Sequence, residues 1–203
     1  MVLGTHVMDL MCFFAGAPAW CFGDVSVDGR PISGEDVREG PEGIGLMAGN
    51  QVLALYGFEG GVRGRFRSYH DLPGGARRMG LELYGSEGML SIRGSMEREV
   101  YLLRSGLWAP GDQERWQAVA CAEWDGVPVS DRLAYTNRLL AQDLIGAIEQ
   151  EREPVSSGSD GRLALEMIMA AYASAVSGQR VSLPLASRQH PLVALVEGGG
   201  DHV

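Results

Sequence analysis

Lysine is absent from this chain. All 17 basic residues are arginines, 26 acidic residues outnumber them, and the formal net charge is −9. Without lysine the chain offers neither an amine for a Schiff base nor a lysine general acid, and it cannot form a Gly-Lys-Ser/Thr phosphate loop. Because contacts to phosphate need a basic surface, the acidic balance also argues against nucleic acid and anionic membranes as partners.

Cysteines and long apolar runs are scarce. The three cysteines, Cys12, Cys21 and Cys121, have no Cys-x-x-Cys spacing and lie among apolar neighbours, which is typical of reduced thiols in a cytoplasmic protein. No apolar run approaches the ~20 residues of a membrane-spanning helix. The four histidines lack metal-ligand spacing, so no metal site is expected. These features predict a cytoplasmic protein without a membrane segment.

A nucleotide-binding signature is missing as well. The chain has 29 glycines, but none of them forms a Gly-x-Gly-x-x-Gly motif that opens a strand–turn–helix unit. The glycines fall instead in predicted turns and loops. We therefore expect that this chain alone binds no dinucleotide cofactor.

What is present is a helix, then many strands, then helices. Apolar residues at helical spacing predict a helix over 7–14, and two pairs of strand-like segments around Gly-containing turns predict hairpins over 52–69 and 79–93. Helical periodicity returns over 130–148 and 162–177. Further strands are expected at 20–27, 99–104, 116–122 and 181–185. The pattern predicts an α+β fold, with a large, mostly antiparallel open β-sheet and helices packed on one face, in a single domain over 1–203.

The two C-terminal helices are expected to have different surroundings. The second helix is apolar nearly all round, and its Glu166 is expected to pair with Arg162 one turn earlier. The tail beyond residue 185 is expected to fray. In the first helix, a stripe predicted to be buried comprises Leu133, Leu140, Leu144 and Ile148.

The first candidate site is an imidazole beside a carboxylate. Spacing of i and i+3 places His6 and Asp9 on one face of the opening helix. A carboxylate next to a histidine can fix the ring tautomer and raise its basicity, which suits proton transfer. The residues alone are also compatible with a surface pair that helps to start the helix.

A second candidate lies on the strand over 62–69. Arg63, Arg65 and Arg67 alternate and so share one face of the sheet, where they could meet an anionic substrate group, the acidic surface of a partner, or only solvent. Tyr69 and His70 end the same strand and could line the mouth of a pocket or form a polar strand end. Both readings stay open from the residues alone.

Five segments, taken in order, resemble one family. They are Gly4-Thr5-His6-Val7-Met8-Asp9, Gly85-Ser86-Glu87-Gly88, and the stretches 143–149, 158–166 and 181–185. Together they resemble the C-terminal domain of the glucose–fructose oxidoreductase / inositol dehydrogenase / rhizopine-catabolism family (Gfo/Idh/MocA), over almost the whole chain.

The resemblance implies an NAD(P)-dependent oxidoreductase acting on a sugar, inositol or related polyol. NAD or NADP would be held by a Rossmann domain absent from this chain. By the same resemblance His6 matches the active-site histidine and Asp9 the acidic residue one turn on. We therefore name His6 as the candidate catalytic residue, and His6, Asp9, Arg67 and Tyr69 as candidate substrate-binding residues.

Two departures from the family pattern bear on activity. Many members carry a lysine general acid/base in a Glu-Lys-Pro motif of the N-terminal domain, and many place an aspartate four residues before the histidine, where this chain has Val2. We expect the chain to be inactive without a nucleotide-binding partner domain.

Three interpretations remain at this point. The chain is the substrate domain of a sugar or polyol dehydrogenase that works with a separate Rossmann-domain partner. Alternatively, it is a non-catalytic module that oligomerises through its open sheet face, as sheet domains of this family commonly do, or binds a ligand. The third is a truncation or a mis-assigned start ahead of Gly4.

Overall fold

The computed structural model describes residues 2–70, 79–94, 99–120 and 126–198. The chain divides into two compact units. Unit 1 comprises Met1–Leu72 and Gly158–Val203, and unit 2 comprises Pro73–Ser157. Each unit is described by itself below.

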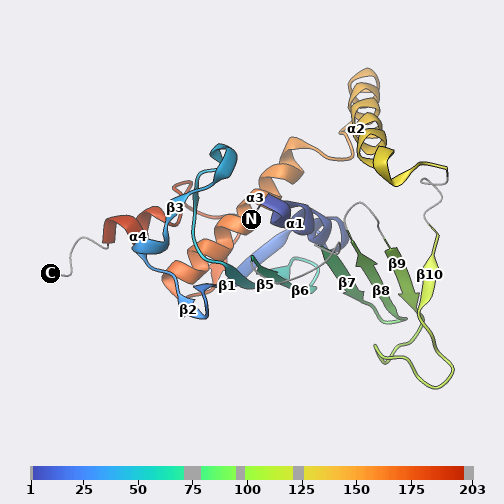
Figure 1. Cartoon of the computed structure of the whole chain (residues 1–203), viewed down its shortest axis with the longest axis horizontal. Helices are drawn as coiled ribbons and strands as arrows, with labels where there is room; N and C mark the ends of the chain where they lie inside the picture. Colours follow the sequence, from blue (N-terminus) through green and yellow to red (C-terminus); the bar gives the residue numbers. More distant parts are fainter. Residues whose placement is uncertain (1, 71–78, 95–98, 121–125, 199–203) are drawn as a thin grey trace. The chain divides into compact units, whose positions relative to one another are not determined.

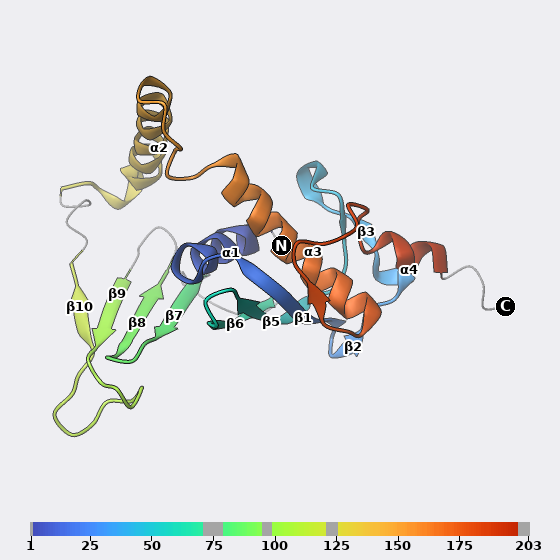
Figure 2. The same cartoon turned by 180° about the vertical axis from the view of Figure 1, so that it is seen from behind.

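Unit 1 is built on a five-stranded antiparallel sheet. Its strand order is β11-β1-β5-β6, and β2 pairs with β1 beyond this path. Figures 1 and 2 show α1 and α3 on the same side of these strands. The elements of unit 1 are α1 (Val2–Ala15), β1 (Pro18–Val27), β2 (Arg30–Pro31), η1 (Gly34–Asp36), β3 (Arg38–Glu39), η2 (Pro41–Gly43), β4 (Leu46–Met47), β5 (Gln51–Phe58), β6 (Arg63–Tyr69), α3 (Gly158–Ser177), β11 (Val181–Ser182) and α4 (Val193–Gly198).

The helices lie directly on one face of this sheet because the strands carry small residues beneath them. A Cβ on Gly23 of β1 would lie 2.8 Å from the carbonyl oxygen of Ala171 in α3. A Cβ on Gly64 of β6 would lie 2.5 Å from Met11 Cε of α1. Tyr56 of β5 is fully buried on this face and donates a hydrogen bond to the Met167 carbonyl of α3 at 2.9 Å. These contacts form the core of unit 1.

The residues after β11 are held in place by a buried carboxylate. Glu166 of α3 is 5% exposed, and its Oε2 accepts a hydrogen bond from Arg162 Nη1 at 2.9 Å. Its Oε1 accepts from the Leu185 backbone N–H at 2.8 Å and from Arg188 Nη1 at 3.2 Å. The predicted pair with Arg162 is confirmed. The predicted fraying after residue 185 is wrong as far as residue 198, because Leu192 is fully buried and α4 follows it.

Unit 2 contains a four-stranded antiparallel sheet in the order β10-β9-β8-β7. The hairpin predicted over 79–93 is confirmed in β7 and β8. Trp108 of the loop after β9 donates a hydrogen bond to the Gly85 carbonyl of the hairpin turn at 2.8 Å. The elements of unit 2 are β7 (Gly80–Tyr84), β8 (Met89–Arg93), β9 (Glu99–Leu103), β10 (Gln117–Val119), η4 (Val129–Asp131) and α2 (Arg132–Glu149).

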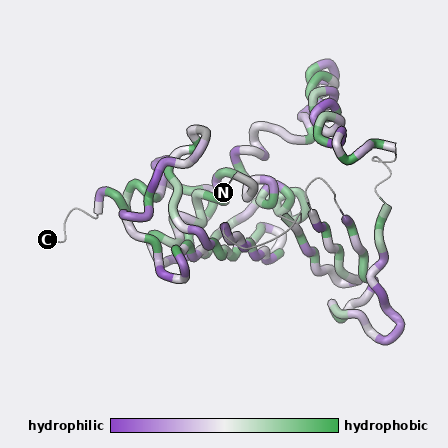
Figure 3. The backbone as a smooth tube through the Cα atoms, in the orientation of Figure 1, coloured by the Kyte–Doolittle hydropathy of each residue, from purple (hydrophilic) through white to green (hydrophobic). Residues whose placement is uncertain are grey.

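Helix α2 forms where the sequence predicts it, but its apolar stripe is not buried. Hydrophobic and hydrophilic segments alternate along it (Figure 3). The predicted stripe is exposed in all four members, from 52% at Leu144 to 70% at Ile148. Amphipathic spacing predicts which side chains share a face, and it does not require that anything covers that face.

The fold class predicted from the sequence is confirmed. The structure is α+β, and every pair of neighbouring strands in the described residues is antiparallel. The strands of these residues fall in sheets of five, four and two, the last formed by β3 and β4. In unit 1 the helices lie on one face, and the other face is open.

Candidate functional site

Helix α1 presents His6 on its outward side. Met8 and Met11 are buried against the rest of unit 1, whereas His6 is exposed. Helical spacing places Leu10 and Phe13 on the same outward side, at i+4 and i+7 from His6. Phe13 is 76% exposed and makes an edge-to-face contact with the exposed Phe14 ring. His6 therefore stands at one end of an exposed apolar stripe, which we call the α1 stripe: Leu10, Phe13 and Phe14.

Asp9 and His6 are not joined in the structure. In the described residues no hydrogen bond or ion pair joins the two side chains. Burial first, and then the negative charges of Asp9 and Asp160, raise the pKa of the Cys12 thiol to about 11. Cys12 Sγ also lies 3.3 Å from Met167 Sδ. Because a thiol with a raised pKa is a poor nucleophile, Cys12 is a packing residue.

Arg67 and Tyr69 are not brought to His6. Gly64 and Phe66 of β6 face the helices, so alternation along the strand turns Arg67 and Tyr69 to the opposite face. A role of these two side chains in binding substrate would need a site on the open face, separate from the α1 site. Their assignment, like that of Asp9, stays a prediction.

The open face has an aromatic and cationic group at one end. The Trp20 indole lies over Gly57, where a Cβ would overlap the ring. The guanidinium carbons of Arg63 and Arg180 lie 5.3 and 5.2 Å from the Trp20 ring centroid, within the range of a cation–π interaction. The alternation of Arg63, Arg65 and Arg67 predicted from the sequence is confirmed, since all three are exposed on this face.

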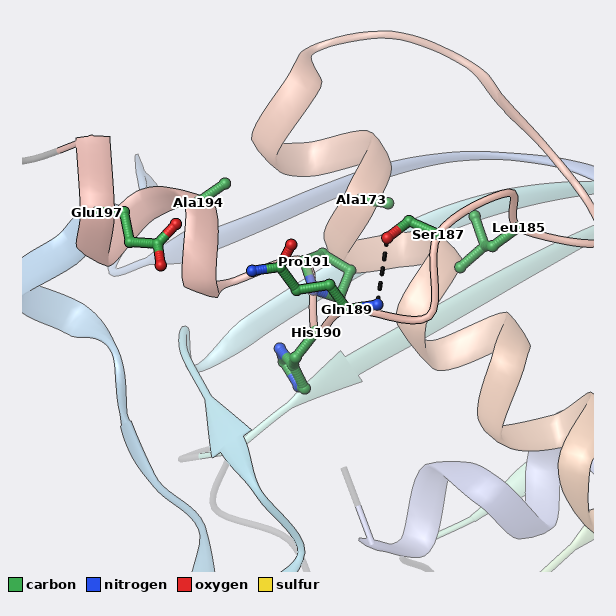
Figure 4. A pocket seen from close by; sticks show the side chains of 8 residues that line it. All are labelled: Ala173, Leu185, Ser187, Gln189, His190, Pro191, Ala194 and Glu197. Atoms are coloured by element: carbon green, nitrogen blue, oxygen red, sulfur yellow. Dashed lines mark hydrogen bonds between the residues drawn. The ribbon is translucent and has the colours of Figure 1, made fainter.

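A cavity of about 220 Å³ lies near the C-terminal end of α3 (Figure 4). Its lining includes Ala173 of α3, Ser187 and His190. His190 Nδ1 accepts a hydrogen bond from the Leu192 N–H at 3.2 Å, and the ring lies 6.0 Å from the Tyr172 ring. Burial lowers the pKa of His190, and the Leu46 backbone and Glu39 partly offset this. Because its Nδ1 accepts from a backbone N–H, the imidazole holds the segment before α4 in place, which is a structural role.

Neither a metal site nor a membrane span is found in the described residues. No cluster of three or more His, Cys, Asp or Glu side chains there could hold a metal ion. None of the helices described is long and apolar enough to cross a bilayer.

Sequence reasoning missed two features of unit 1. Phe13 was not assigned to any surface, although its spacing from His6 was a usable signal. The apolar residues of the open face were also missed, because alternation in β1 and β5 was interpreted only as evidence for strands. These residues are Phe22, Leu53 and Leu55.

Several solved structures share this fold. The "oxidoreductase domain protein from Kribbella flavida" is 21% identical, with a TM-score of 0.64 over 90% of this chain and 49% of its own. A levoglucosan dehydrogenase in complex with NADH and levoglucosan is 17% identical, with the same TM-score and coverage. The WlbA dehydrogenase from Bordetella pertussis, in complex with NADH and UDP-GlcNAcA, is 18% identical, with a TM-score of 0.56 over 90% of this chain and 44% of its own.

The chain spans about half the length of these structures, and at these identities the likeness establishes the fold alone. No curated protein sequence matches the chain. The model of the oxidoreductase family's C-terminal alpha/beta domain matches residues 1–183. The order of elements, the open antiparallel sheet with α1 and α3 on one face, and this match agree: the chain belongs to the C-terminal domain family of the Gfo/Idh/MocA oxidoreductases.

Proposed function

We propose that this chain is the substrate-binding domain of an NAD(P)-dependent oxidoreductase that acts on a sugar or an inositol-like polyol. The observation that carries the proposal is the α1 stripe in line with His6. An exposed apolar stripe beside a titratable side chain is a surface that a second domain can cover, and covering it would enclose His6.

The chemistry expected at His6 is positioning of the reacting hydroxyl. A neutral imidazole can accept the hydroxyl proton while hydride leaves the same carbon for the nicotinamide. NAD or NADP supplies the hydride acceptor, and its binding would be the work of a separate Rossmann-domain partner. Among the neighbours, the levoglucosan and WlbA dehydrogenases are described in complex with NADH, which supports a nicotinamide for the complete enzyme.

The test is titration of the isolated chain with NAD and with NADP, in which binding is measured by tryptophan fluorescence and by calorimetry. We expect no binding at physiological cofactor concentrations, because the chain has no Gly-rich phosphate loop. Micromolar affinity for either cofactor would contradict the assignment of the cofactor to a partner domain.

The second candidate function is a non-catalytic oligomerisation or ligand-binding module. It is favoured by one observation, the three large apolar side chains exposed on the open face of the unit 1 sheet. In this proposal the chain forms a homo-oligomer through that face. The absence of nicotinamide-dependent activity in every mixture with a nucleotide-binding partner, together with stable self-association, would favour it over the first.

We also propose that the protein is cytoplasmic, together with the nucleotide-binding partner domain that it would need. Free Cys12 and Cys21 support this placement, because a reducing compartment keeps thiols unpaired. Detection of the labelled chain in the cytoplasmic fraction of disrupted cells would support this placement, and its detection in another fraction would contradict it.

A further inference from the structure

In unit 2 the loop after β9 is packed against the turn of the β7–β8 hairpin. A Cβ on Gly106 would lie 3.3 Å from the Ser86 carbonyl oxygen. The Trp108 indole N–H donates to the Gly85 carbonyl at 2.8 Å, and the Trp108 backbone N–H donates to the Ser105 carbonyl at 3.4 Å. Figure 1 shows this loop between β9 and β10. These contacts hold the first part of the loop, and Trp108 with it, on the hairpin turn.

Trp108 has an unfavourable backbone conformation. Its φ is +56°, in the left-handed region that bulky side chains rarely adopt because the Cβ comes too close to the following carbonyl oxygen. The ring is not buried in return, since Trp108 is 55% exposed. Strained residues of this kind cluster at sites that bind ligands. The loop therefore holds a large aromatic ring in solvent at a cost to stability that burial does not offset.

A second exposed ring lies beside Trp108. Tyr84 of β7 is 52% exposed, and the two rings make an edge-to-face contact with their centroids 5.6 Å apart. Rings at this separation touch, so no ligand fits between them. An edge-to-face contact covers one face of only one ring, and at least one face of each ring lies outside it. We call Tyr84 and Trp108 the aromatic platform.

A carboxylate lies at the edge of the aromatic platform. Glu82 precedes Tyr84 by two residues on β7, so both side chains point to the same face of the sheet. Glu82 Oε2 accepts a hydrogen bond from the Tyr84 hydroxyl at 2.7 Å. Within the described residues no hydrogen bond reaches Oε1 of this exposed side chain. Oε1 can therefore accept from a hydroxyl group of a ligand that lies on the rings, and a charged acceptor strengthens such a bond.

We propose that the aromatic platform binds a neutral pyranose, with a C–H face of the sugar stacked on a ring and a hydroxyl group donating to Glu82 Oε1. The axial C–H groups of a pyranose carry a partial positive charge, which suits the electron-rich face of an aromatic ring. The equatorial hydroxyl groups point outward, where a polar group at the edge of the rings can bind them. Aromatic side chains with a few placed polar groups are typical of sites for small molecules.

Charge and ring spacing narrow the class of ligand. The Glu82 carboxylate repels a phosphorylated or carboxylated sugar. A quaternary ammonium ion binds over aromatic faces, but it is best held between rings that surround it, and the rings of the platform touch each other. A neutral sugar fits both conditions.

This site is separate from the one proposed at His6. The aromatic platform belongs to unit 2, whereas His6 belongs to unit 1. Binding at the platform needs neither a nicotinamide nor a partner domain, so the inference does not rest on the oxidoreductase function. The isolated chain should bind the sugar without a cofactor.

The experiment is an NMR titration of the full chain with the methyl β-glycosides of glucose and galactose. The four tryptophans give separate indole N–H signals, and Trp108→Phe and Trp20→Phe identify two of them by their loss. We expect at least one glycoside, at millimolar concentration, to shift the Trp108 signal and leave the Trp20 signal in place. Glucuronic acid and tetramethylammonium, titrated in parallel, should shift the Trp108 signal much less. No shift with either glycoside, or a larger shift with tetramethylammonium, overturns the proposal.

Three variants separate stacking from the conformation of the loop. Trp108→Gly removes the ring and tolerates the positive φ, and we expect the dissociation constant, measured by saturation-transfer NMR of the sugar, to rise by roughly 10-fold or more. Glu82→Gln keeps an uncharged acceptor and should raise it by roughly 3- to 10-fold. Leu107→Ala is the matched control, since Leu107 is 86% exposed and lies outside the ring pair, and its affinity should stay at the wild-type value.

Circular dichroism of each variant shows whether the fold is kept. Unchanged affinity in a folded Trp108→Gly overturns the stacking. An equal loss in Leu107→Ala and Trp108→Gly assigns the effect to the loop and also overturns it. If Trp108→Gly does not fold, the titration of the wild-type chain decides, because a shift confined to signals other than that of Trp108 contradicts binding at the platform.

Discussion

Gly23 of β1 and Ala171 of α3 are in backbone contact: a Cβ on Gly23 would lie 2.8 Å from the Ala171 carbonyl oxygen and 3.0 Å from its Cα. The approach brings the Gly23 N–H within 2.9 Å of Ser174 Oγ, which accepts its hydrogen bond. Helix α3 therefore packs directly on β1, and Phe22 and Asp24 of the same strand point to the open face.

The first prediction follows from this contact. Gly23→Ala should lower the free energy of unfolding by about 1–3 kcal/mol, because a methyl group must push a helix backbone away from a strand. Urea unfolding followed by circular dichroism measures it. Gly60→Ala is the matched control, since a Cβ there meets no atom within 4 Å. An equal loss in both variants would show that α3 does not lie this close to β1.

The second prediction concerns the buried carboxylate of Glu166. Glu166→Gln keeps the shape but removes the charge, and it turns an amide N–H₂ toward groups that are themselves donors. We expect a loss of about 1–3 kcal/mol in unfolding free energy, because one of the two acceptor oxygens becomes a donor and the remaining hydrogen bonds to arginine lose their charge partner. Arg162→Gln should cost less than about 1 kcal/mol, because that side chain is 57% exposed. A larger loss in the arginine variant than in the glutamate variant would contradict this ranking.

The third prediction is a pH dependence at His190. Its pKa is lowered from 6.5 in the folded chain, so the unfolded chain binds the proton more readily. The contribution of His190 to the free energy of unfolding is then fully present above pH 6.5. It is lost as the pH falls through the lower pKa of the folded chain. Protonation also places a donor at Nδ1, opposite the Leu192 N–H.

The measurement for His190 is the urea midpoint at pH 7.5 and pH 5.5. The wild-type midpoint should fall more than that of His190→Asn, whose side-chain oxygen can still accept from Leu192 but does not titrate. The difference between the two proteins isolates His190 from the carboxylates, which titrate in both. Equal falls in the two proteins would show that His190 does not contribute to the pH dependence of stability.

Much of unit 1 was predictable because its signals are local. The turn Glu59-Gly60-Gly61 predicted the β5–β6 hairpin, and the alternation of arginines predicted an exposed face on β6. The segment after β11 was not predictable, because it is held by Glu166 and Tyr172, side chains far away in the sequence. The exposure of the α2 stripe was missed for a related reason, since spacing defines a face and not what lies against it.

The candidate site was predictable only in part. Helical spacing predicted the helix that carries His6, and the structure shows His6 exposed on it. The spacing did not indicate that Arg67 and Tyr69 lie on the face of β6 turned away from the helices. The face of a strand residue is decided by which neighbours are covered, and here Met11 over Gly64 decides it. The sequence shows that alternation without showing which side a helix covers.

The most direct test of whether this chain is a substrate-binding domain is the oxidation of a panel of sugars and polyols. The chain is mixed with a nucleotide-binding domain that carries Gly-x-Gly-x-x-Gly and Glu-Lys-Pro. NADH or NADPH formation is followed at saturating cofactor, for wild type and His6→Ala. We expect turnover only in the mixture and its loss in His6→Ala. The unfolding free energy of that variant should stay close to wild type, since His6 is exposed. Turnover by the chain alone, or unchanged turnover in His6→Ala, would contradict it.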